Sequence, residues 1–154
     1  MNATLSTDRT HRFSDPTIAR AFLLAGAARF TLVSKRTGER FTFRIAKAKV
    51  DEYKYGEEAP YFVSVLTGPS NSSDFTFLGT IFSDGYYARG KKGRPYCEGP
   101  SARAFAWFWL RLRAGELPAS CEVWHEGRCG RCGRALTVPE SIASGIGPTC
   151  AEAE

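Results

Sequence analysis

The chain has 154 residues, of which 43% are hydrophobic and 13% aromatic, and this is enough to form the core of one domain. The composition excludes a globally disordered chain, and the sequence contains no apolar run of about 18 residues or more that could span a membrane. The formal net charge of +5 mildly favours an acidic partner such as nucleic acid, although 16 acidic residues are interspersed along the chain.

The N-terminal sequence and the cysteines predict the compartment. Residues 1–8 lack a basic segment followed by an apolar one, so we expect no secretory signal. The five cysteines are an odd number and include a Cys-x-x-Cys, which suits a metal in a reducing cytoplasm better than a disulfide scaffold. Two cysteines are then spare, and we expect Cys121 in a strand as a small core residue and Cys97 exposed in a loop.

The hydrophobic periodicity predicts two helices with strands between them. The first helix is expected at residues 14–26, because Asp15 and Pro16 favour a helix start and Gly26 a stop. The second helix is expected at residues 101–113. The predicted strands are residues 30–34, 41–45, 61–66 and 75–82, with a last short strand at 122–124. The predicted turns and loops are residues 35–39, 48–60, 68–74 and 83–100.

The second predicted helix has one apolar stripe and one unusual residue outside it. The stripe follows the i, i+3, i+4, i+7 spacing and consists of Phe105, Phe108, Trp109 and Leu112. Trp107 falls on the opposite face with Arg103 and Arg111, where an exposed Trp often marks an interface. The alternative is that the sheet and the first helix cover this helix on both sides.

These elements predict an α+β fold. Two hairpins form an antiparallel sheet of about four strands, the helix at residues 101–113 packs across one face, and a zinc knuckle closes the C-terminal end. We expect a flexible N-terminus at residues 1–13, an α+β domain at 14–120 and a zinc-binding module at 121–154 packed on it. The module is too small to bury much apolar surface, so a zinc-binding free energy on the order of 10 kcal/mol would hold it together.

The strongest chemical signal is a group of residues with zinc-ligand spacing near the C-terminus. Cys129 and Cys132 form a Cys-x-x-Cys followed by a glycine, a knuckle that points two thiolates at one tetrahedral ion, and Cys150 is a third ligand. A redox Cys-x-x-Cys would need a βαβ context, which the pattern lacks. His125 is the candidate fourth ligand, with Cys121, Glu126 or water as alternatives. The prediction is one structural Zn²⁺.

The residues around these cysteines form a longer signature. It runs Cys-x-x-Cys-Gly-Arg-x-Leu, then Pro and Ser, then Gly-x-Gly-Pro-x-Cys, and its positions here are Cys129, Cys132, Gly133, Arg134, Leu136, Pro139, Ser141, Gly145, Gly147, Pro148 and Cys150. Over about residues 125–151 the chain thus resembles an uncharacterised family of zinc-ribbon-like domains of unknown function, common in bacteriophage, plasmid and bacterial proteins. The resemblance implies zinc, a mobile-element context and a bacterial host cell, and it implies no activity.

The sequence argues against an enzyme. A zinc-dependent nucleobase deaminase needs His-x-Glu or Cys-x-Glu upstream of Pro-Cys-x-x-Cys, whereas Arg128 precedes Cys129 and no such triplet lies upstream. The chain has two histidines, so a Ser–His–Asp arrangement would have to use His11 or His125. The sequence also contains no Gly-rich phosphate-binding signature. We therefore expect a protein without catalytic activity.

Nucleic-acid binding is the leading functional prediction. Basic residues gather in three groups, which are Lys91, Lys92 and Arg94 with Arg89 in one loop, Arg128, Arg131 and Arg134 on the knuckle, and Arg36, Arg40 and Arg44 on the first hairpin. Tyrosines in the adjoining loops are candidates for stacking on bases, namely Tyr53, Tyr55, Tyr86 and Tyr87. The alternative interpretation is that the arginines are merely solvated and that the tyrosines cover the core.

The rival prediction is a protein-binding module. A small mobile-element protein without a catalytic signature can act by blocking a host protein, including a bacterial defence complex. Inhibitors that mimic DNA tend to be acidic, and at +5 this chain is not such a mimic. In this interpretation Trp107 and its flanking arginines form the contact surface, and no membrane partner is expected in either case.

Overall fold

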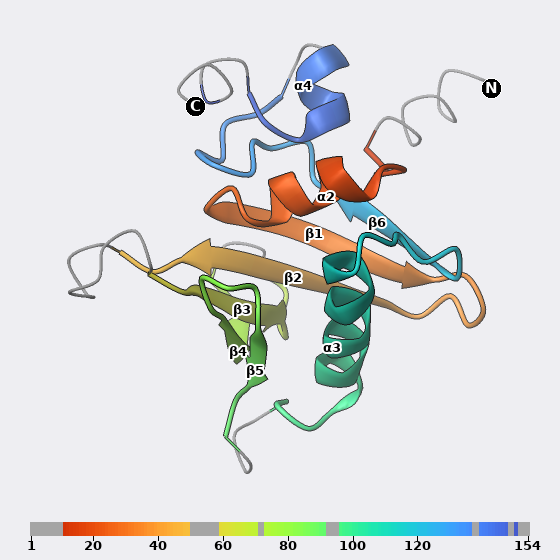
Figure 1. Ribbon diagram of the computed structural model, residues 1–154, viewed down its shortest axis with the longest axis vertical. Coiled ribbons are helices and arrows are strands. Elements are labelled where there is room, and N and C mark those ends of the chain that lie inside the picture. The colour runs from red at the N-terminus through yellow and green to blue at the C-terminus, as the bar shows by residue number, and fades with distance from the viewer. Residues whose placement is uncertain are drawn as a thin grey trace.

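The computed structural model describes residues 11–49, 59–70, 73–91, 96–136, 139–147 and 150. Its elements, in chain order, are α2 (Pro16–Leu23), β1 (Ala27–Ser34), β2 (Arg40–Lys47), β3 (Tyr61–Leu66), β4 (Phe75–Ile81), β5 (Tyr87–Arg89), α3 (Pro100–Arg113), β6 (Cys121–His125) and α4 (Pro139–Ser144) (Figure 1). Asp15 starts α2 by accepting hydrogen bonds from the backbone of Thr17 and Ile18. Among the described residues, no helix is both long and apolar enough to cross a membrane.

The strands form one antiparallel sheet with the order β5-β4-β3-β2-β1-β6. The α+β prediction is confirmed, but the sheet has six strands instead of about four. One additional strand, β6, corresponds to the short strand predicted at residues 122–124. The other, β5, lies inside the predicted loop 83–100 and has three residues, too few to show an alternating pattern.

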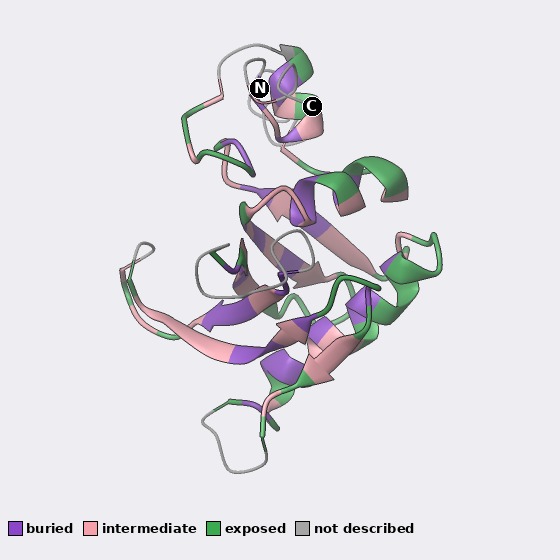
Figure 2. Ribbon diagram, turned by 60° about the vertical axis from the view of Figure 1, so that its left-hand side comes forward, coloured by how far each residue is buried: buried purple, intermediate pink, exposed green. Residues whose placement is uncertain are grey.

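Both longer helices cover the same face of the sheet (Figure 1). Along β1 and β2 the buried residues alternate with more exposed ones, so every second side chain enters the core (Figure 2). Phe30 and Phe43 lie side by side on neighbouring strands, with ring centroids 5.5 Å apart, and Phe105 of α3 packs against both. Full burial of each such ring contributes about 1.5–3 kcal/mol, so this layer fixes α3 on the sheet.

The opposite face of the sheet carries half-buried polar and aromatic side chains. Thr31 and Thr42 form a cross-strand hydrogen bond of 2.8 Å, and the guanidinium carbon of Arg44 lies 4.7 Å from the centre of the Phe75 ring. Arg44 therefore packs over an aromatic neighbour, and a contact of the hairpin arginines with nucleic acid stays a prediction.

The segment before α3 corrects the expectation for Cys97. This thiol is fully buried rather than exposed, and its Sγ lies 3.4 Å from the carbonyl oxygen of Leu78. Residues 96–99 fold back against β4, which a loop composition rich in Gly and Lys cannot reveal. Cys121 lies at the start of β6 and is half-buried, close to its expected place in a strand.

Residues 11–13 run along the open edge of β6. The Phe13 amide donates to Val123 at 2.9 Å, and the His125 amide donates to His11 at 2.9 Å. The ring of Phe13 is buried against Phe22 of α2, with centroids 5.1 Å apart. The end of β6 that leads into the cysteine-containing segment is thereby covered on its outer side.

Candidate functional site

Three cysteines come together in the segment after β6, described at residues 126–136, 139–147 and 150, which we call the cysteine module. The Sγ atoms of Cys129, Cys132 and Cys150 all lie within 4.8 Å of one another. Cys129 is buried, Cys132 is exposed and Cys150 is half-buried. The knuckle turns at Gly133, which has φ +81°, and its ends are joined by hydrogen bonds from Cys129 to Arg134 and from Leu136 to Gly127. The sequence spacing correctly predicted this cluster.

The backbone prepares one of these thiols to bind as a thiolate. Burial alone would raise the pKa of Cys129, but backbone N–H groups of Gly147, Cys132 and Arg131 outweigh it and lower this pKa to about 7. The Arg131 N–H lies 3.4 Å from the sulfur. In contrast, hydrogen bonding to Cys132 raises the pKa of Cys150 to about 11. The cluster therefore holds protons that a bound cation would displace.

The donor set fits a soft, tetrahedral metal ion such as zinc. A Zn–S distance of about 2.3 Å in a tetrahedron places the sulfurs roughly 3.8 Å apart, so small side-chain movements bring the three thiolates to that spacing. Zinc would supply the crosslink among Cys129, Cys132 and Cys150 that this short segment cannot obtain from its apolar surface.

His125 lies outside the cysteine cluster. Its Nε2 donates to the carbonyl oxygen of Ile142 in α4 at 2.6 Å, and its Nδ1 accepts from the Gly127 amide at 2.9 Å. The ring also stacks on His11, with centroids 4.9 Å apart. A metal-bound His125 would have to give up one of these two backbone partners. Its role as fourth ligand stays a prediction, while in the structure it links β6 to α4.

A pH-dependent effect follows from the neutral His125 ring. Burial first, and His11 to a lesser extent, lower the pKa of His125 below 6.5, although the Ile142 carbonyl partly offsets this. The unfolded chain therefore binds the proton first, so the contribution of His125 is complete above about pH 6.5 and is lost as pH falls.

The substitution His125→Gln tests this contribution. We expect the unfolding free energy of the native protein to fall more steeply between pH 7.5 and 5.5 than that of the variant, in parallel urea titrations. Metal analysis of the same variant provides the control, since a retained full equivalent of zinc excludes His125 as a ligand. Equal slopes for both proteins would contradict the role of the neutral ring.

The cysteine module packs on Phe22 of α2 through two glycines. A Cβ on Gly130 would lie 2.7 Å from the Phe22 ring, and a Cβ on Gly145, which has φ +77°, would also overlap that ring. The Ala27 amide donates to Gly130 at 2.7 Å, which joins the module to β1. Close backbone approach to one buried ring thus places the knuckle against α2 and the sheet.

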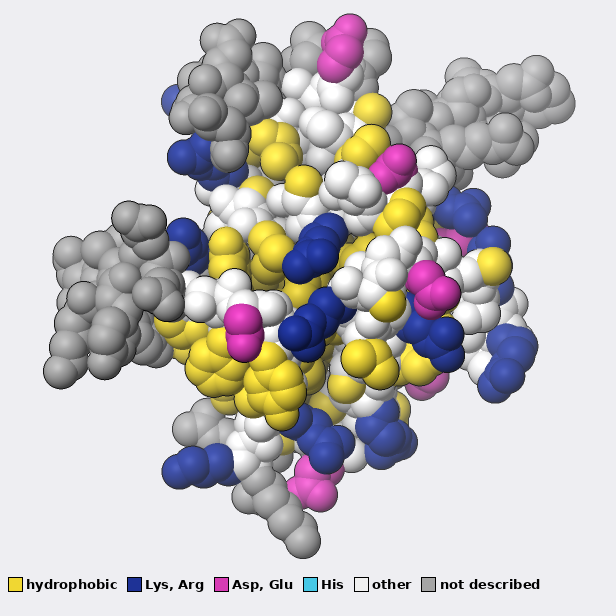
Figure 3. All heavy atoms as spheres, in the orientation of Figure 1, with side chains coloured by type: hydrophobic (Ala, Val, Ile, Leu, Met, Phe, Trp, Pro, Cys, Tyr) yellow, Lys and Arg dark blue, Asp and Glu magenta, His cyan; other side chains and the backbone are white. Residues whose placement is uncertain are grey.

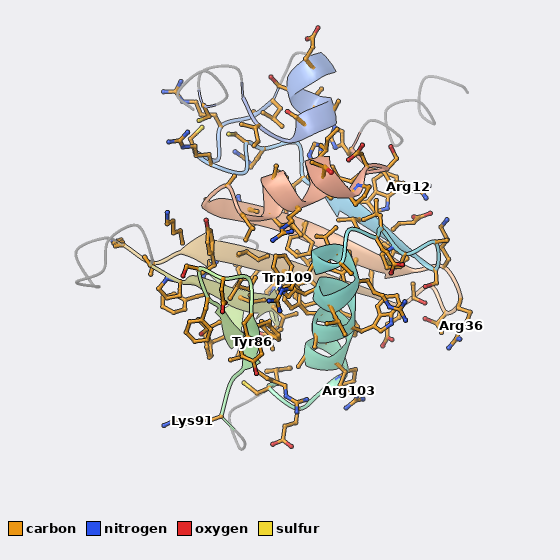
Figure 4. The ribbon with its side chains drawn as sticks, viewed as in Figure 1. Arg12, Arg36, Tyr86, Lys91, Arg103 and Trp109 are labelled. Atoms are coloured by element: carbon orange, nitrogen blue, oxygen red, sulfur yellow. The ribbon has the colours of Figure 1, made fainter. Side chains whose placement is uncertain are left out.

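The predicted basic groups do not form one surface. Arg128, Arg131 and Arg134 are exposed on the knuckle, where Arg128 also donates to the Gly133 carbonyl at 3.1 Å. Lys91 is exposed at the opposite end of the molecule from the module (Figure 4). Lys92 and Arg94 lie outside the described residues.

Of the four tyrosines predicted to stack on bases, the structure describes two, and these two differ in exposure. Tyr53 and Tyr55 lie outside the described residues. Tyr87 belongs to the core, because its ring meets the Phe105 ring edge-on at 5.1 Å and burial raises its pKa to about 12. Tyr86 is 55% exposed on the turn between β4 and β5, which leaves it available for an external contact.

Sequence reasoning missed a groove where the module meets the sheet, which we call the module groove. It has a volume of about 710 Å³. Its lining consists of Ala21, Leu24, Ala25, Lys47, Tyr61, Arg131, Ser144 and Ile146. The Lys47 ammonium lies 5.9 Å from the centre of the Tyr61 ring, and the Tyr61 hydroxyl donates to the Leu24 carbonyl at 3.0 Å. Among the described lining residues there are two cations and no carboxylate.

Trp107 is on the outer face of α3, as predicted, and is 40% exposed. It lies between two further grooves of about 370 Å³ and 640 Å³. Arg111 lies over its ring at 5.8 Å, while Arg36 and Glu39 line the smaller groove. The side chain is therefore shared between two grooves instead of being covered by the core.

Comparison with known proteins gives a match only for the C-terminal part of the chain. No curated protein and no solved structure matches the chain. Residues 124–154 match a family described as "Family of unknown function (DUF6011)", and this range contains all three clustered cysteines. The C-terminal part of the chain is therefore similar to a family of unknown function and carries a cluster that could hold a metal ion.

Proposed function

We propose that this chain is a non-enzymatic, zinc-containing protein that binds nucleic acid, with the module groove as its principal phosphate-binding site. The observation that carries the proposal is the pair of cations, Lys47 and Arg131, in one groove whose described lining has no carboxylate. Phosphate contacts of this kind supply most of the affinity in sequence-independent nucleic-acid binding. The overall charge of +5 adds favourable long-range attraction.

The proposal gives the metal a structural role. Lys47 comes from the end of β2, whereas Arg131 lies between two of the clustered cysteines, so the groove needs the knuckle in place. Arg131 also donates to the Cys150 carbonyl at 3.2 Å, across the cluster. One Zn²⁺ bound there would hold Arg131 opposite Lys47. The mobile-element context and the bacterial cytoplasm implied by the family resemblance are part of the same proposal.

A salt-dependent titration tests the proposal. Fluorescence anisotropy with labelled single-stranded and duplex DNA should show binding whose affinity falls with salt. The variant with Lys47→Gln and Arg131→Gln should flatten the log K against log salt slope by about 1.4 on single strands, from about 0.7 per lost phosphate contact. Lys47→Gln alone, which leaves the knuckle intact, should give about half that change.

The matched control removes the same charge elsewhere. Arg36→Gln with Arg40→Gln lowers the net charge equally on the β1–β2 hairpin, and we expect it to leave the slope nearly unchanged (Arg36 is labelled in Figure 4). If both double substitutions flattened the slope equally, binding would depend on the overall charge and not on the module groove. A wild-type affinity weaker than about 1 mM at low salt, below the usual range of non-specific binding, would contradict the proposal.

A second candidate function is binding to a host protein, including a bacterial defence complex. The observation that favours it is Trp107, which is exposed between two grooves and flanked by Arg36 and Arg111. A host protein that co-purifies after nuclease treatment, and is lost with Trp107→Ala, would support this function over nucleic-acid binding.

A further inference from the structure

The tight turn between β4 and β5, residues 82–86, carries two exposed aromatic rings on a rigid support; we call it the aromatic turn. The Phe82 amide donates to the Tyr86 carbonyl at 2.9 Å, and the Gly85 amide donates to the Phe82 carbonyl at 2.8 Å. Gly85 has φ +91°, a conformation that other residues rarely adopt. The buried indole of Trp109 in α3 donates to the Gly85 carbonyl at 2.9 Å. The turn is therefore fixed to the core from below.

The two rings face solvent with nearly parallel planes. Phe82 is 45% exposed and Tyr86 is 55% exposed. Their centroids lie 6.5 Å apart and their planes differ by 16°. Exposing two large aromatic rings to water costs free energy, and such rings held in one orientation at a surface often mark a binding site. Figure 4 shows Tyr86 on this turn, on the face that also carries α3.

Two arginines from different helices converge beside these rings. A Cβ on Gly85 would lie 3.3 Å from Nε of Arg113 in α3 and 3.7 Å from Nη2 of Arg20 in α2. In the described part of the chain, neither guanidinium forms an ion pair. The nearby Asp84 carboxylate instead accepts a hydrogen bond from the Tyr86 amide at 2.9 Å. Figure 3 shows Lys and Arg side chains next to a hydrophobic patch on this face.

The aromatic turn and the module groove are connected along α2. Arg20 lines a shallow groove together with Ala21 and Leu24, and these two residues also line the module groove. The two grooves therefore adjoin along α2, with Lys47 and Arg131 in one and Arg20 in the other. Arg20 and Arg113 both lie beside Gly85 of the aromatic turn.

We propose that the aromatic turn stacks unpaired bases, so that the protein prefers single-stranded over double-stranded nucleic acid. Phe82 and Tyr86 would stack on bases, while Arg20 and Arg113 would bind the adjoining phosphates, which is the combination that single-strand-binding surfaces use. In a duplex the base faces are covered by neighbouring bases, so the rings have nothing to stack on. This inference rests on the proposed nucleic-acid function and specifies its ligand.

The experiment compares single-stranded and duplex DNA of the same sequence by anisotropy, using the whole 154-residue chain loaded with zinc. Phe82→Leu with Tyr86→Leu keeps the surface apolar but removes the rings; we expect roughly tenfold or greater weakening on single strands, with an unchanged salt slope and little change on duplex. Arg20→Gln with Arg113→Gln should instead flatten the slope on single strands by about 1.4. The matched control is Trp107→Leu, an exposed aromatic on the other side of α3, which should bind as the native protein does.

The outcomes separate this inference from the function on which it rests. If the native protein binds both DNA forms equally and the ring variant binds as well as the native protein, the aromatic turn has no role, while the module groove remains a phosphate site. If neither DNA form binds, both proposals fail. If Trp107→Leu weakens binding and the ring variant does not, the contact surface lies on the opposite side of α3 and the inference is overturned. Circular dichroism melting of each variant confirms that the comparison uses folded protein.

Discussion

Replacing Cys129 with Ser is expected to abolish stoichiometric zinc binding and to unfold the cysteine module while the rest of the sheet remains folded. Zinc bound to such a site contributes on the order of 10 kcal/mol to folding. Among the described residues, the module buries few apolar side chains that could compensate for the loss of the metal. β6 pairs with β1 over five residue pairs, so the sheet should survive up to His125. Addition of a chelator to the native protein should have the same effect.

Metal analysis and hydrogen exchange together test this prediction. Protein purified without added metal should contain one zinc per chain, and Cys129→Ser or Cys150→Ser should remove it. Amide protection should be lost in the module and retained at Phe43, Val63 and Leu78, which are buried in the sheet. Cys121→Ser is the control, because its thiol lies outside the cluster. A Cys129–Cys132 disulfide without metal, or full zinc in Cys129→Ser, would contradict the account.

The substitution Gly145→Ala is expected to destabilise the folded protein by about 2–5 kcal/mol. A methyl group at this position would overlap the Phe22 ring, and overpacking of this kind costs about 1–3 kcal/mol. The positive φ of +77° adds about 1–2 kcal/mol for any residue with a Cβ. Since the Phe22 side chain of α2 is fully buried, it has no free space into which to move.

Gly38→Ala is the matched control for backbone strain. Gly38 has φ +76°, but a Cβ there meets no atom within 4 Å. Denaturant unfolding of the two variants should therefore differ by the cost of the Phe22 overlap, about 1–3 kcal/mol. Equal losses would mean that the module does not pack on Phe22 as the structure describes.

The elements with a clear pattern could be predicted from the sequence. The apolar stripe of α3 and the turn at residues 35–39 defined a helix and a hairpin that the structure contains. The strand β5 could not be predicted, because three residues carry no periodicity and its position depends on the Trp109–Gly85 hydrogen bond. The burial of Cys97 was missed for the same reason, since it depends on contacts with β4.

The candidate sites likewise include one that the sequence predicted and others that it did not. The cluster of three cysteines could be predicted, because Cys-x-x-Cys spacing and a third Cys constrain the geometry locally. The module groove could not, since Lys47 and Arg131 are far apart in sequence and meet only through the packing of the knuckle on Phe22. The partners of His125 in α4 and at Gly127 were equally invisible, because hydrogen bonds to backbone carbonyl and amide groups leave no sequence pattern.

The most direct test of nucleic-acid binding is an amide chemical-shift map of the zinc-loaded protein titrated with a short single-stranded oligonucleotide. We expect the largest shifts around Lys47, Tyr61 and Arg131, along α2 and in the aromatic turn, with little change at Trp107. The absence of shifts at millimolar oligonucleotide, or a pattern centred on Trp107 that leaves the module groove unchanged, would contradict this expectation.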